Sequence, residues 1–429
     1  MFWNKEIECA SRDYLCDVQN SKLREMLVRA SRTEFYRESE TRGIDPRRAT
    51  LDDLPHLFFT YKSDLRRYYP LGLLACEMEE VIEVHASSGT TGKPTTVGYT
   101  RGDIKVWKQA MARAMTAAGL TRNDVVQNAY GYGLFTGGLG FHYGCDEIGA
   151  AVIPVSGGRT DFQLMIAEDF GSTALCCTPS FALYLASEAE QMNRSLKNTK
   201  LRVGMFGAEP WSEDMRELIE SKSGLKAFDT YGLSEIIGPG VAFECKEKNG
   251  LHINEDLFFP EVIDRESGEP VAEGEMGELV ITSLAREAVP LVRYRTGDRV
   301  FLSAEPCACA RTLRRMSRVV GRTDDMLIVA GVNFYPSQVE SLILGVEGTN
   351  GQYQIWLWTE DARDYIEARI EVDTDLYSDP EGCASLADQV AARLRDNIGI
   401  RILVKIVKPG AIERPTGKAI RVVDKREKR

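Results

Sequence analysis

The spacing of apolar and polar residues changes several times along the chain, and each change predicts a different kind of structure. Before residue 81, "NSKLREMLVRASRTEFYRESE" has helical spacing and ends in polar turns. Beyond it, short apolar runs such as "VVQNAY", "TALCCT" and "LRVGMFG" alternate with amphipathic stretches such as "PSFALYLASEAEQ" and "SEDMRELIESKSG". Short strands that alternate with helices predict βα units around a parallel sheet.

Two later changes in the pattern indicate further units. Between about residues 241 and 318, runs such as "GELVITSL" and "RVFLSAE" predict a β-rich subdomain. After "VVGRTDD", we expect a helix over "VNFYPSQVESLILGV", paired strands, a helix over "ASLADQVAARLRDNI" and a last strand. The sequence therefore predicts a multidomain α/β protein, with a large domain over residues 1–323 and a small α+β domain over 324–429.

Composition narrows the class of protein. The chain has 429 residues, of which 43% are apolar and 27% charged, and no apolar run approaches the roughly eighteen residues of a membrane helix. The start lacks a signal-peptide core, so we expect a cytoplasmic protein whose ten cysteines are reduced. A net charge of -11 argues against nucleic acid or membrane as a partner, so an anionic ligand would need local amides and a few cations.

The stretch "HASSGTTGKPTTVGYT" is the first candidate site. It lies between two strand-like runs, and its glycines allow successive backbone N–H groups to point inward while hydroxyls and Lys93 add donors and charge. The spacing differs from that of a Walker A loop. A phosphate cradle is one interpretation, and a polar turn is the alternative. The residues concerned are Ser87, Ser88, Gly89, Thr90, Thr91, Gly92 and Lys93.

A second candidate lies in the β-rich region. Cys245 and His252 in "FECKEKNGLHI", with Cys307 and Cys309 in "EPCACART", offer the sulfur and nitrogen ligands of a structural Zn²⁺ site. Their spacing differs from that of a zinc finger. The alternative is a set of reduced, partly buried cysteines beside a hydrogen-bonded histidine.

Five further motifs occur in a fixed order: "FGAEP", "TYGLSE", "YRTGD", "GRTDD" and "ERPTGK". Together with the glycine-rich loop they resemble the acyl-adenylate-forming, AMP-binding superfamily. The residues of "HASSGTTGKPT", "YGYGLFTGGLG" and "DDMLIVAGVNFYPSQVE" are similar to those of the phenylacetate–CoA ligase family. The resemblance extends over nearly the whole chain. Most of the superfamily continues the first loop with Pro-Lys-Gly, whereas this chain has Pro94, Thr95 and Thr96, the shorter form of that family.

The resemblance implies an ATP-dependent aryl acid–CoA ligase with ATP and CoA as substrates, Mg²⁺ as cofactor, and phenylacetate or a benzoate-type acid as the acid. An aryl carboxylate would attack ATP to give an acyl-adenylate and pyrophosphate, and CoA would then displace AMP. The glycine-rich loop would hold phosphates, and Glu235 would bind Mg²⁺. Asp298 would accept the ribose hydroxyls, and Arg322 would contact ribose or phosphate. The residues implied around the adenine are Gly207, Ala208, Glu209, Tyr231 and Gly232.

Lys418 in "ERPTGK" is the residue implied for adenylation, because its ammonium would contact both the incoming carboxylate and the α-phosphate. Its alternative is a solvated lysine of the basic C-terminal tail. Asp324 matches the hinge about which the small domain of this superfamily turns between half-reactions. An ordinary loop aspartate is the alternative.

The resemblance also implies an aryl pocket, lined by Tyr130, Phe135, Phe141, Ile236 and Pro239. Family members that use phenylacetate tend to have a small residue at the position of Phe141, so a phenylalanine there points to a benzoate-type acid such as an amino- or hydroxybenzoate. The alternative is that Phe141 turns into the core.

The phenylacetate–CoA ligase family often carries a Cys/His set similar to Cys245, His252, Cys307 and Cys309, and this resemblance favours the zinc interpretation.

Two other functions remain open from the sequence. One is an adenylyltransferase that passes AMP to a phenolic acceptor without CoA. The other is a non-catalytic nucleotide-binding regulatory protein, against which Glu235, Asp298 and Lys418 speak together. The sequence also leaves open whether the chain forms a homodimer.

Overall fold

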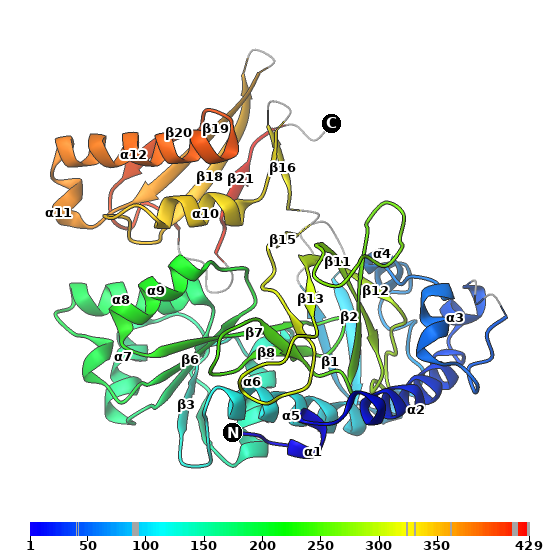
Figure 1. Ribbon diagram of the computed structural model, residues 1–429. Helices are drawn as coiled ribbons and strands as arrows, with labels where there is room; N and C mark the ends of the chain where they lie inside the picture. The colour runs from blue at the N-terminus through cyan, green and yellow to red at the C-terminus, as the bar shows by residue number, and fades with distance from the viewer. Residues whose placement is uncertain are drawn as a thin grey trace.

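The computed structural model describes residues 1–39, 41, 43–87, 94–322, 325–329, 332–360, 363–413 and 419–426. Figure 1 shows a large part below and a smaller part, coloured yellow to red, above it. Strands that alternate with helices in the large part, and a small α+β part, confirm the predicted α/β class with a large N-terminal and a small C-terminal domain. The expected boundary at residues 323 and 324 lies outside the described residues, so the domain limits stay a prediction.

A mixed sheet organises the large domain. Its order is β13-β14-β9-β8-β7-β6-β5-β3-β4, and the run from β4 to β7 is parallel, as the βα pattern predicted. The strands are β3 (Val125–Asn128), β4 (Ala151–Ile153), β5 (Ala174–Cys177), β6 (Val203–Gly207), β7 (Lys226–Leu233), β8 (Gly238–Glu244), β9 (Leu251–Ile253), β13 (Leu302–Ser303) and β14 (Arg315–Met316). The parallel strands are connected by α6 (Thr136–Ile148), α7 (Thr160–Asp169), α8 (Pro179–Gln191) and α9 (Glu213–Ser223).

The strands expected as one β-rich subdomain over residues 241–318 are divided between two sheets. β8 pairs antiparallel with β7 and so continues the large sheet through β9, β14 and β13. A separate antiparallel sheet contains β10 (Phe258–Ile263), β11 (Gly277–Ser283), β12 (Tyr294–Val300) and β15 (Gly321–Arg322). The division follows from the short turn after β7, which folds the chain back along the same sheet.

A two-stranded antiparallel sheet carries the glycine-rich loop. β1 (Val81–Ser87) pairs with β2 (Thr95–Thr100), with Ser87 opposite Thr95. The loop was predicted to connect two strands, and this is confirmed. Residues 88–93 between the strands lie outside the described part of the chain.

The remaining helices of the large domain precede or border these sheets. They are α1 (Lys5–Glu8), α2 (Arg12–Ala30), α3 (Glu34–Glu38), η1 (Leu51–His56), α4 (Lys62–Arg67), η2 (Met78–Glu80), α5 (Arg101–Ala117) and η3 (Leu196–Asn198). α5 lies in the main core, where Trp107 and Met111 are fully buried. Thr60, just before α4, is hydrogen-bonded to both Arg293 and Arg295 around the start of β12, which fixes α4 beside that strand.

The small domain is built on a sheet in the order β20-β19-β18-β21. Its elements are β16 (Leu327–Val329), β17 (Val332–Phe334), α10 (Pro336–Leu344), β18 (Tyr353–Glu360), β19 (Arg363–Glu371), α11 (Thr374–Tyr377), α12 (Pro380–Ile398), β20 (Leu403–Val407) and β21 (Val422–Asp424). The single helix expected over residues 332–346 is wrong at its start, where β17 pairs with β16. Pro336 begins α10 because proline restricts the residue before it to extended backbone.

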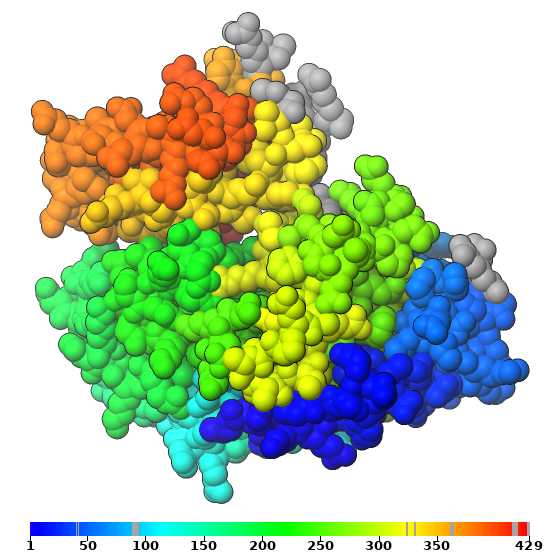
Figure 2. All heavy atoms as spheres, viewed as in Figure 1, coloured from blue at the N-terminus to red at the C-terminus, as the bar shows by residue number. Residues whose placement is uncertain are grey.

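The small domain rests on the α8 and α9 side of the large domain, as Figure 2 shows for the orange and yellow atoms above the green ones. Helices α9 and α10 contact each other, and Ser341 Oγ donates to Asp214 Oδ2 at 2.6 Å. Gly351 lies against Leu183 of α8, where the Cβ of any other residue would stand 2.2 Å from a leucine carbon. Among the described residues, no helix has the length and apolar character needed to cross a membrane.

Candidate active site

Glu235 lies at the centre of the first polar cluster. It follows β7 in the tight turn toward β8, and only 6% of its side chain is exposed. Its Oε1 is 3.0 Å from the Lys62 ammonium of α4 and accepts a hydrogen bond from Ser87 Oγ at 3.3 Å. A buried carboxylate with a cation beside it is therefore held at the first residue of the glycine-rich loop. Carboxylate oxygen at such a position suits a hard cation such as Mg²⁺.

Asp298 forms the second cluster with two residues that the sequence analysis also named. Its Oδ2 accepts a hydrogen bond from the Tyr231 hydroxyl at 2.6 Å, and its Oδ1 lies 2.8 Å from Arg322 Nη1. The strands explain the meeting, because Asp298 of β12 is directly paired with Arg322 of β15. Burial and the nearby Asp298 charge raise the pKa of Tyr231 well above its ordinary range, so the phenol stays a donor.

The "FGAEP" loop leaves β6 with an unusual backbone. Gly207 cannot carry a side chain, because a Cβ would lie 2.2 Å from the Thr230 carbonyl oxygen. Ala208 then adopts a left-handed φ of 70°, which is uncommon for a residue other than glycine. This turn directs Glu209 toward two backbone donors, Ser180 N at 2.8 Å and Ala419 N at 3.2 Å.

Gly232 of the "TYGLSE" motif has a steric role similar to that of Gly207. Gly232 lies where β7 and β8 converge, and a Cβ there would stand 1.9 Å from the Gly238 carbonyl oxygen. Tyr231, its neighbour, is thereby fixed next to the loop of Glu235. The residues expected around an adenine thus lie at the ends of two adjacent parallel strands, β6 and β7, or directly after β6, at the same edge of the sheet.

Several expected site residues fall outside the described residues. They are Ser88, Gly89, Thr90, Thr91, Gly92, Lys93, Asp324 and Lys418. Ala419, which follows Lys418 in the sequence, is described and belongs to the small domain's C-terminal segment. Its N–H donates to Glu209 of the large domain, and Ala419 also borders on an interdomain cavity of about 230 Å³ lined in part by Phe181, Tyr184 and Arg421.

The residues expected in the aryl pocket differ in exposure. Tyr130 and Phe141 stack face to face, with ring centroids 5.0 Å apart and an interplanar angle of 5°. Both are buried, as is Ile236, whereas Phe135 is 37% exposed. Pro239 packs over Gly140, where a Cβ would lie 2.4 Å from the proline ring. Phe141 is part of the main core, as are Tyr130 and Ile236, which agrees with the alternative that it turns into the core.

The four residues of the predicted metal site lie together and are buried. Their ligand atoms are all within 4.8 Å of one another. Cys245 Sγ lies 3.8 Å from Cys307 Sγ, close to the separation of about 3.8 Å expected for two thiolates on tetrahedral zinc. His252 donates from Nδ1 to the Leu313 carbonyl at 3.3 Å, which turns its Nε2 toward Cys309 Sγ at 3.4 Å. The donor set and its geometry fit Zn²⁺.

Sequence reasoning missed Lys62. It lies at the first position of α4 in "TYKSDLRR", and nothing in that basic stretch separates it from the arginines that follow. Its place depends on the pairing of Thr60 with β12, residues more than two hundred positions away. A contact of that kind has no local signal in the sequence.

The fold and the two carboxylate clusters define the class of protein, and comparison with known proteins agrees. A family model described as "AMP-binding enzyme" matches residues 60–285, and one described as "AMP-binding enzyme C-terminal domain" matches residues 331–426. The protein is an adenylate-forming enzyme. A phenylacetate–coenzyme A ligase of Thermus thermophilus is 44% identical over all of both chains. One from Escherichia coli is also 44% identical, over 98% of this chain and 97% of its own. The chain belongs to the phenylacetate–CoA ligase family of AMP-forming acid–CoA ligases.

Comparison with solved structures of a ligase in two catalytic states indicates how the two domains of this chain are arranged. A 2-hydroxyisobutyryl-CoA ligase in the postadenylation state, in complex with 2-HIB-AMP, superimposes with a TM-score of 0.92 at 25% identity, over 99% of this chain and 92% of that one. The same ligase with 2-HIB-AMP and CoA in the thioesterification state gives a TM-score of 0.72 at 26% identity, over 99% and 93%. The arrangement described here is therefore similar to the first state and differs from the second.

Proposed function

We propose that the acid activated by this ligase is an aryl carboxylate, with phenylacetate as its principal substrate. The observation that carries the proposal is the 44% identity to phenylacetate–coenzyme A ligases over the full chain length. The aromatic pair of Tyr130 and Phe141 supports it, because a flat ring binds well beside stacked aromatic side chains. A benzoate-type acid is the other outcome that a substrate panel distinguishes.

The proposed reaction has two steps. A carboxylate oxygen of the acid attacks the α-phosphorus of ATP, and the bond to the β-phosphate oxygen breaks, which releases pyrophosphate. The CoA sulfur then attacks the acyl carbon, AMP leaves and the thiol proton is lost to solvent. Because both partners of the first step are anionic, the site must supply positive charge.

We infer that the Glu235 cluster supplies that charge at the phosphates. Glu235 would bind Mg²⁺, which when present neutralises phosphate oxygens. Lys62 already lies 3.0 Å from this carboxylate and would contribute a direct contact to the phosphates. Ser87 begins the loop whose remaining residues, 88–93, we propose as the phosphate cradle.

Asp298 is proposed to bind the ribose hydroxyls. Its two oxygens are already engaged by Tyr231 and Arg322, which hold the carboxylate in one orientation. A carboxylate suits this task because each of its oxygens can accept more than one hydrogen bond. The loops of Gly207, Ala208 and Gly232 are proposed to border the adenine.

Lys418 is proposed to act in the first step, and the small domain to turn about Asp324 before the second. The position of Ala419 against the "FGAEP" loop supports the first part, and the difference in superposition between the two solved states supports the second. Gly331 in the segment that follows Asp324 is proposed to approach the CoA thiol after the turn.

We further propose a structural zinc ion on Cys245, His252, Cys307 and Cys309, where it would tie the loop after β8 and the strand β9 to the 307–309 loop. The cytoplasm is the proposed location, since none of the ten cysteines forms a disulfide. A homodimer stays a hypothesis.

The direct test is a panel of phenylacetates and benzoates assayed for AMP, pyrophosphate and CoA thioester. The proposal expects phenylacetate to give the highest kcat/KM, with CoA consumed in proportion to AMP. A preference for a benzoate would replace the acid. AMP release without CoA consumption would indicate the adenylyltransferase alternative.

A further inference from the structure

Two carboxylates, one from each domain, lie beside the segment that follows Lys418. Glu209 belongs to the large domain, and Glu340 of α10 belongs to the small domain and is 3% exposed. Arg421 lies near both, and the positive charge of this arginine is favoured by each of the two carboxylates. The sequence analysis assigned Glu209 to the adenine border and gave Glu340 and Arg421 no role.

Arg421 fixes one end of this segment within the small domain. Its guanidinium lies over the Tyr353 ring at 4.3 Å, and its Nη1 donates to the carbonyl oxygens of Gly351 and Tyr353. Its Nη2 lies 3.7 Å from Glu340 Oε2, which also accepts the Tyr353 hydroxyl at 3.0 Å. The chain at Arg421 therefore moves with the small domain.

Glu209 holds the other end of the segment from the large domain. Its Oε1 accepts from Ser180 N at the start of α8, and its Oε2 accepts from Ala419 N. That N–H belongs to the peptide group between Lys418 and Ala419. The carboxylate therefore connects the large domain to the residue next to the proposed catalytic lysine.

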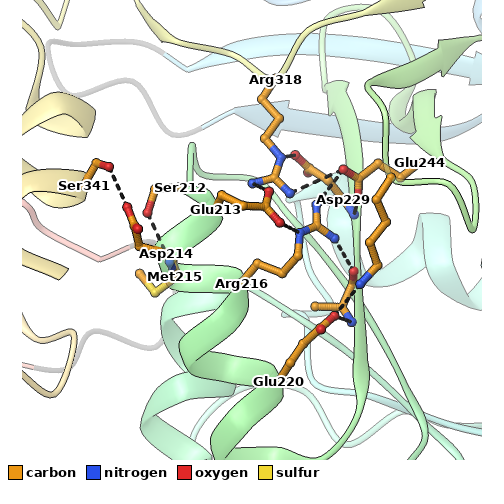
Figure 3. A network of polar contacts seen from close by, with 12 residues as sticks. Ser212, Glu213, Asp214, Met215, Arg216, Glu220, Asp229, Glu244, Arg318 and Ser341 are labelled. Carbon is orange, nitrogen blue, oxygen red and sulfur yellow. Dashed lines mark hydrogen bonds and ion pairs between the residues drawn. The ribbon is translucent and has the colours of Figure 1, made fainter. Parts of the chain in front are cut away.

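The start of α9 in the large domain makes further contacts with the small domain, and Figure 3 shows the polar network around it. Ser212 caps α9, and its own N–H donates to Glu340 at 3.3 Å, while Asp214 accepts from Ser341. On the opposite side of the same helix turn, Arg216 forms two hydrogen bonds to Glu244 at 2.6 and 2.8 Å. The start of α9 is thus anchored to the sheet and presents fixed partners to α10.

We propose that Glu209 is a positioning residue for adenylation: its bond to Ala419 N holds the residue that follows Lys418 against the large domain, and this bond breaks when the small domain turns. The inference rests on the proposed function, in which Lys418 acts in the first half-reaction only. A carboxylate suits the task because its bond to an N–H is strong while formed and is readily exchanged for water when the domains separate.

The test compares the two half-reactions in Glu209→Gln. The amide is isosteric and keeps one oxygen for Ser180 N, but its NH₂ group cannot accept from Ala419 N. Acid-dependent ATP–pyrophosphate exchange should fall about tenfold, with the KM for ATP within about twofold of wild type. Thioester formation from supplied phenylacetyl-AMP and CoA should be unchanged or faster. Ser341→Ala is the matched control, because it removes an interdomain bond that does not touch the Lys418 segment, and its exchange rate should change less than about threefold.

Hydrogen exchange of the intact protein gives a second readout. Peptides covering residues 419–426 should exchange faster in Glu209→Gln than in wild type, while those of α8 should not change. Equal loss of both half-reactions in Glu209→Gln would overturn the inference. So would a fall in ATP–pyrophosphate exchange that is as large in Ser341→Ala, or a raised KM for ATP in Glu209→Gln with an unchanged rate at saturation. A wild-type enzyme without either half-reaction would instead refute the proposed function.

Discussion

At the scale of the single residue, the ion pair between Lys62 and Glu235 makes a direct prediction. Replacing Lys62 with Met removes a positive charge from the proposed phosphate site, and a charged hydrogen bond contributes about 1.5–3 kcal/mol. We expect the KM for ATP in Lys62→Met to rise about tenfold to a hundredfold, while the KM for the acid changes little. Steady-state kinetics measure both KM values, and Lys105→Met, at an exposed lysine, is the control. An unchanged KM for ATP in Lys62→Met would show that Lys62 does not belong to the phosphate site.

Phe141 makes the second residue-scale prediction. Because it is 1% exposed and stacked on Tyr130, Phe141→Ala should cost about 3–5 kcal/mol of unfolding free energy. The space that it leaves should let Tyr130 relax and admit longer arylacetates. Denaturant unfolding measures the first effect, and the acid panel measures the second. A stability loss with an unchanged acid profile would show that Phe141 is only a core residue.

The sequence motifs predicted which residues meet, but not all of their contacts. Asp298, Tyr231 and Arg322 were named from separate motifs and are hydrogen-bonded to one another. The bond from Glu209 to Ala419 and the position of Lys62 depend on chain segments distant in sequence, so local spacing carries no information about them.

At the scale of the element, the metal cluster connects the end of β8, the strand β9 and the loop over residues 307–309. We expect one zinc per chain by elemental analysis, and its loss in Cys307→Ser together with a lower melting temperature, because metal binding contributes to folding. Cys383→Ser, in α12, is the control and should keep its zinc. Wild-type protein without zinc, and with chelator-resistant stability, would contradict the site.

Asp229 of β7 makes a pH-dependent prediction within the network of Figure 3. The Arg216 guanidinium is hydrogen-bonded to Glu244, and the shortest distance between Arg318 and the Asp229 carboxylate is 3.9 Å. Burial and the Glu244 charge raise the pKa of Asp229 from 3.8 to about 7. The folded protein thus keeps a proton that the unfolded chain releases, so this group lowers the free energy of unfolding as pH rises from about 4 to about 7.

Asp229→Asn should remove that decline. The variant should therefore have a higher free energy of unfolding than wild type, and this advantage should be larger at pH 7.5 than at pH 5. Urea unfolding at the two pH values measures the difference. Glu213→Gln, a 61% exposed member of the same network, should show no such difference. A pH dependence identical to that of wild type would show that Asp229 is ionised in the folded state.

Elements with a clear period were predicted well, and those set by tertiary pairing were not. The helices α8 and α12 contain the stretches predicted as helices, "PSFALYLASEAEQ" and "ASLADQVAARLRDNI", because their apolar spacing is regular. The strand β17 was missed because Val332–Phe334 pairs with β16 only in the folded domain. The division of the β-rich stretch between two sheets likewise depends on which neighbour each strand finds.

At the scale of the whole molecule, the motifs gave the family and hence the two-domain fold, but no local pattern specifies how the domains are placed. That placement depends on a few interdomain contacts, such as Ser341 with Asp214 and Glu340 with Ser212. It is similar to the postadenylation arrangement of a solved ligase. The central claim, that Lys418 acts from the small domain only in the first half-reaction, is therefore a claim about this arrangement.

The most direct test of that claim is to measure both half-reactions in Lys418→Ala. Acid-dependent ATP–pyrophosphate exchange should fall on the order of 10²–10³-fold, because the ammonium would stabilise charge that develops in the transition state. Thioester formation from supplied phenylacetyl-AMP and CoA should stay close to the wild-type rate. An equal fall in both half-reactions, or exchange at the wild-type rate, would contradict the account.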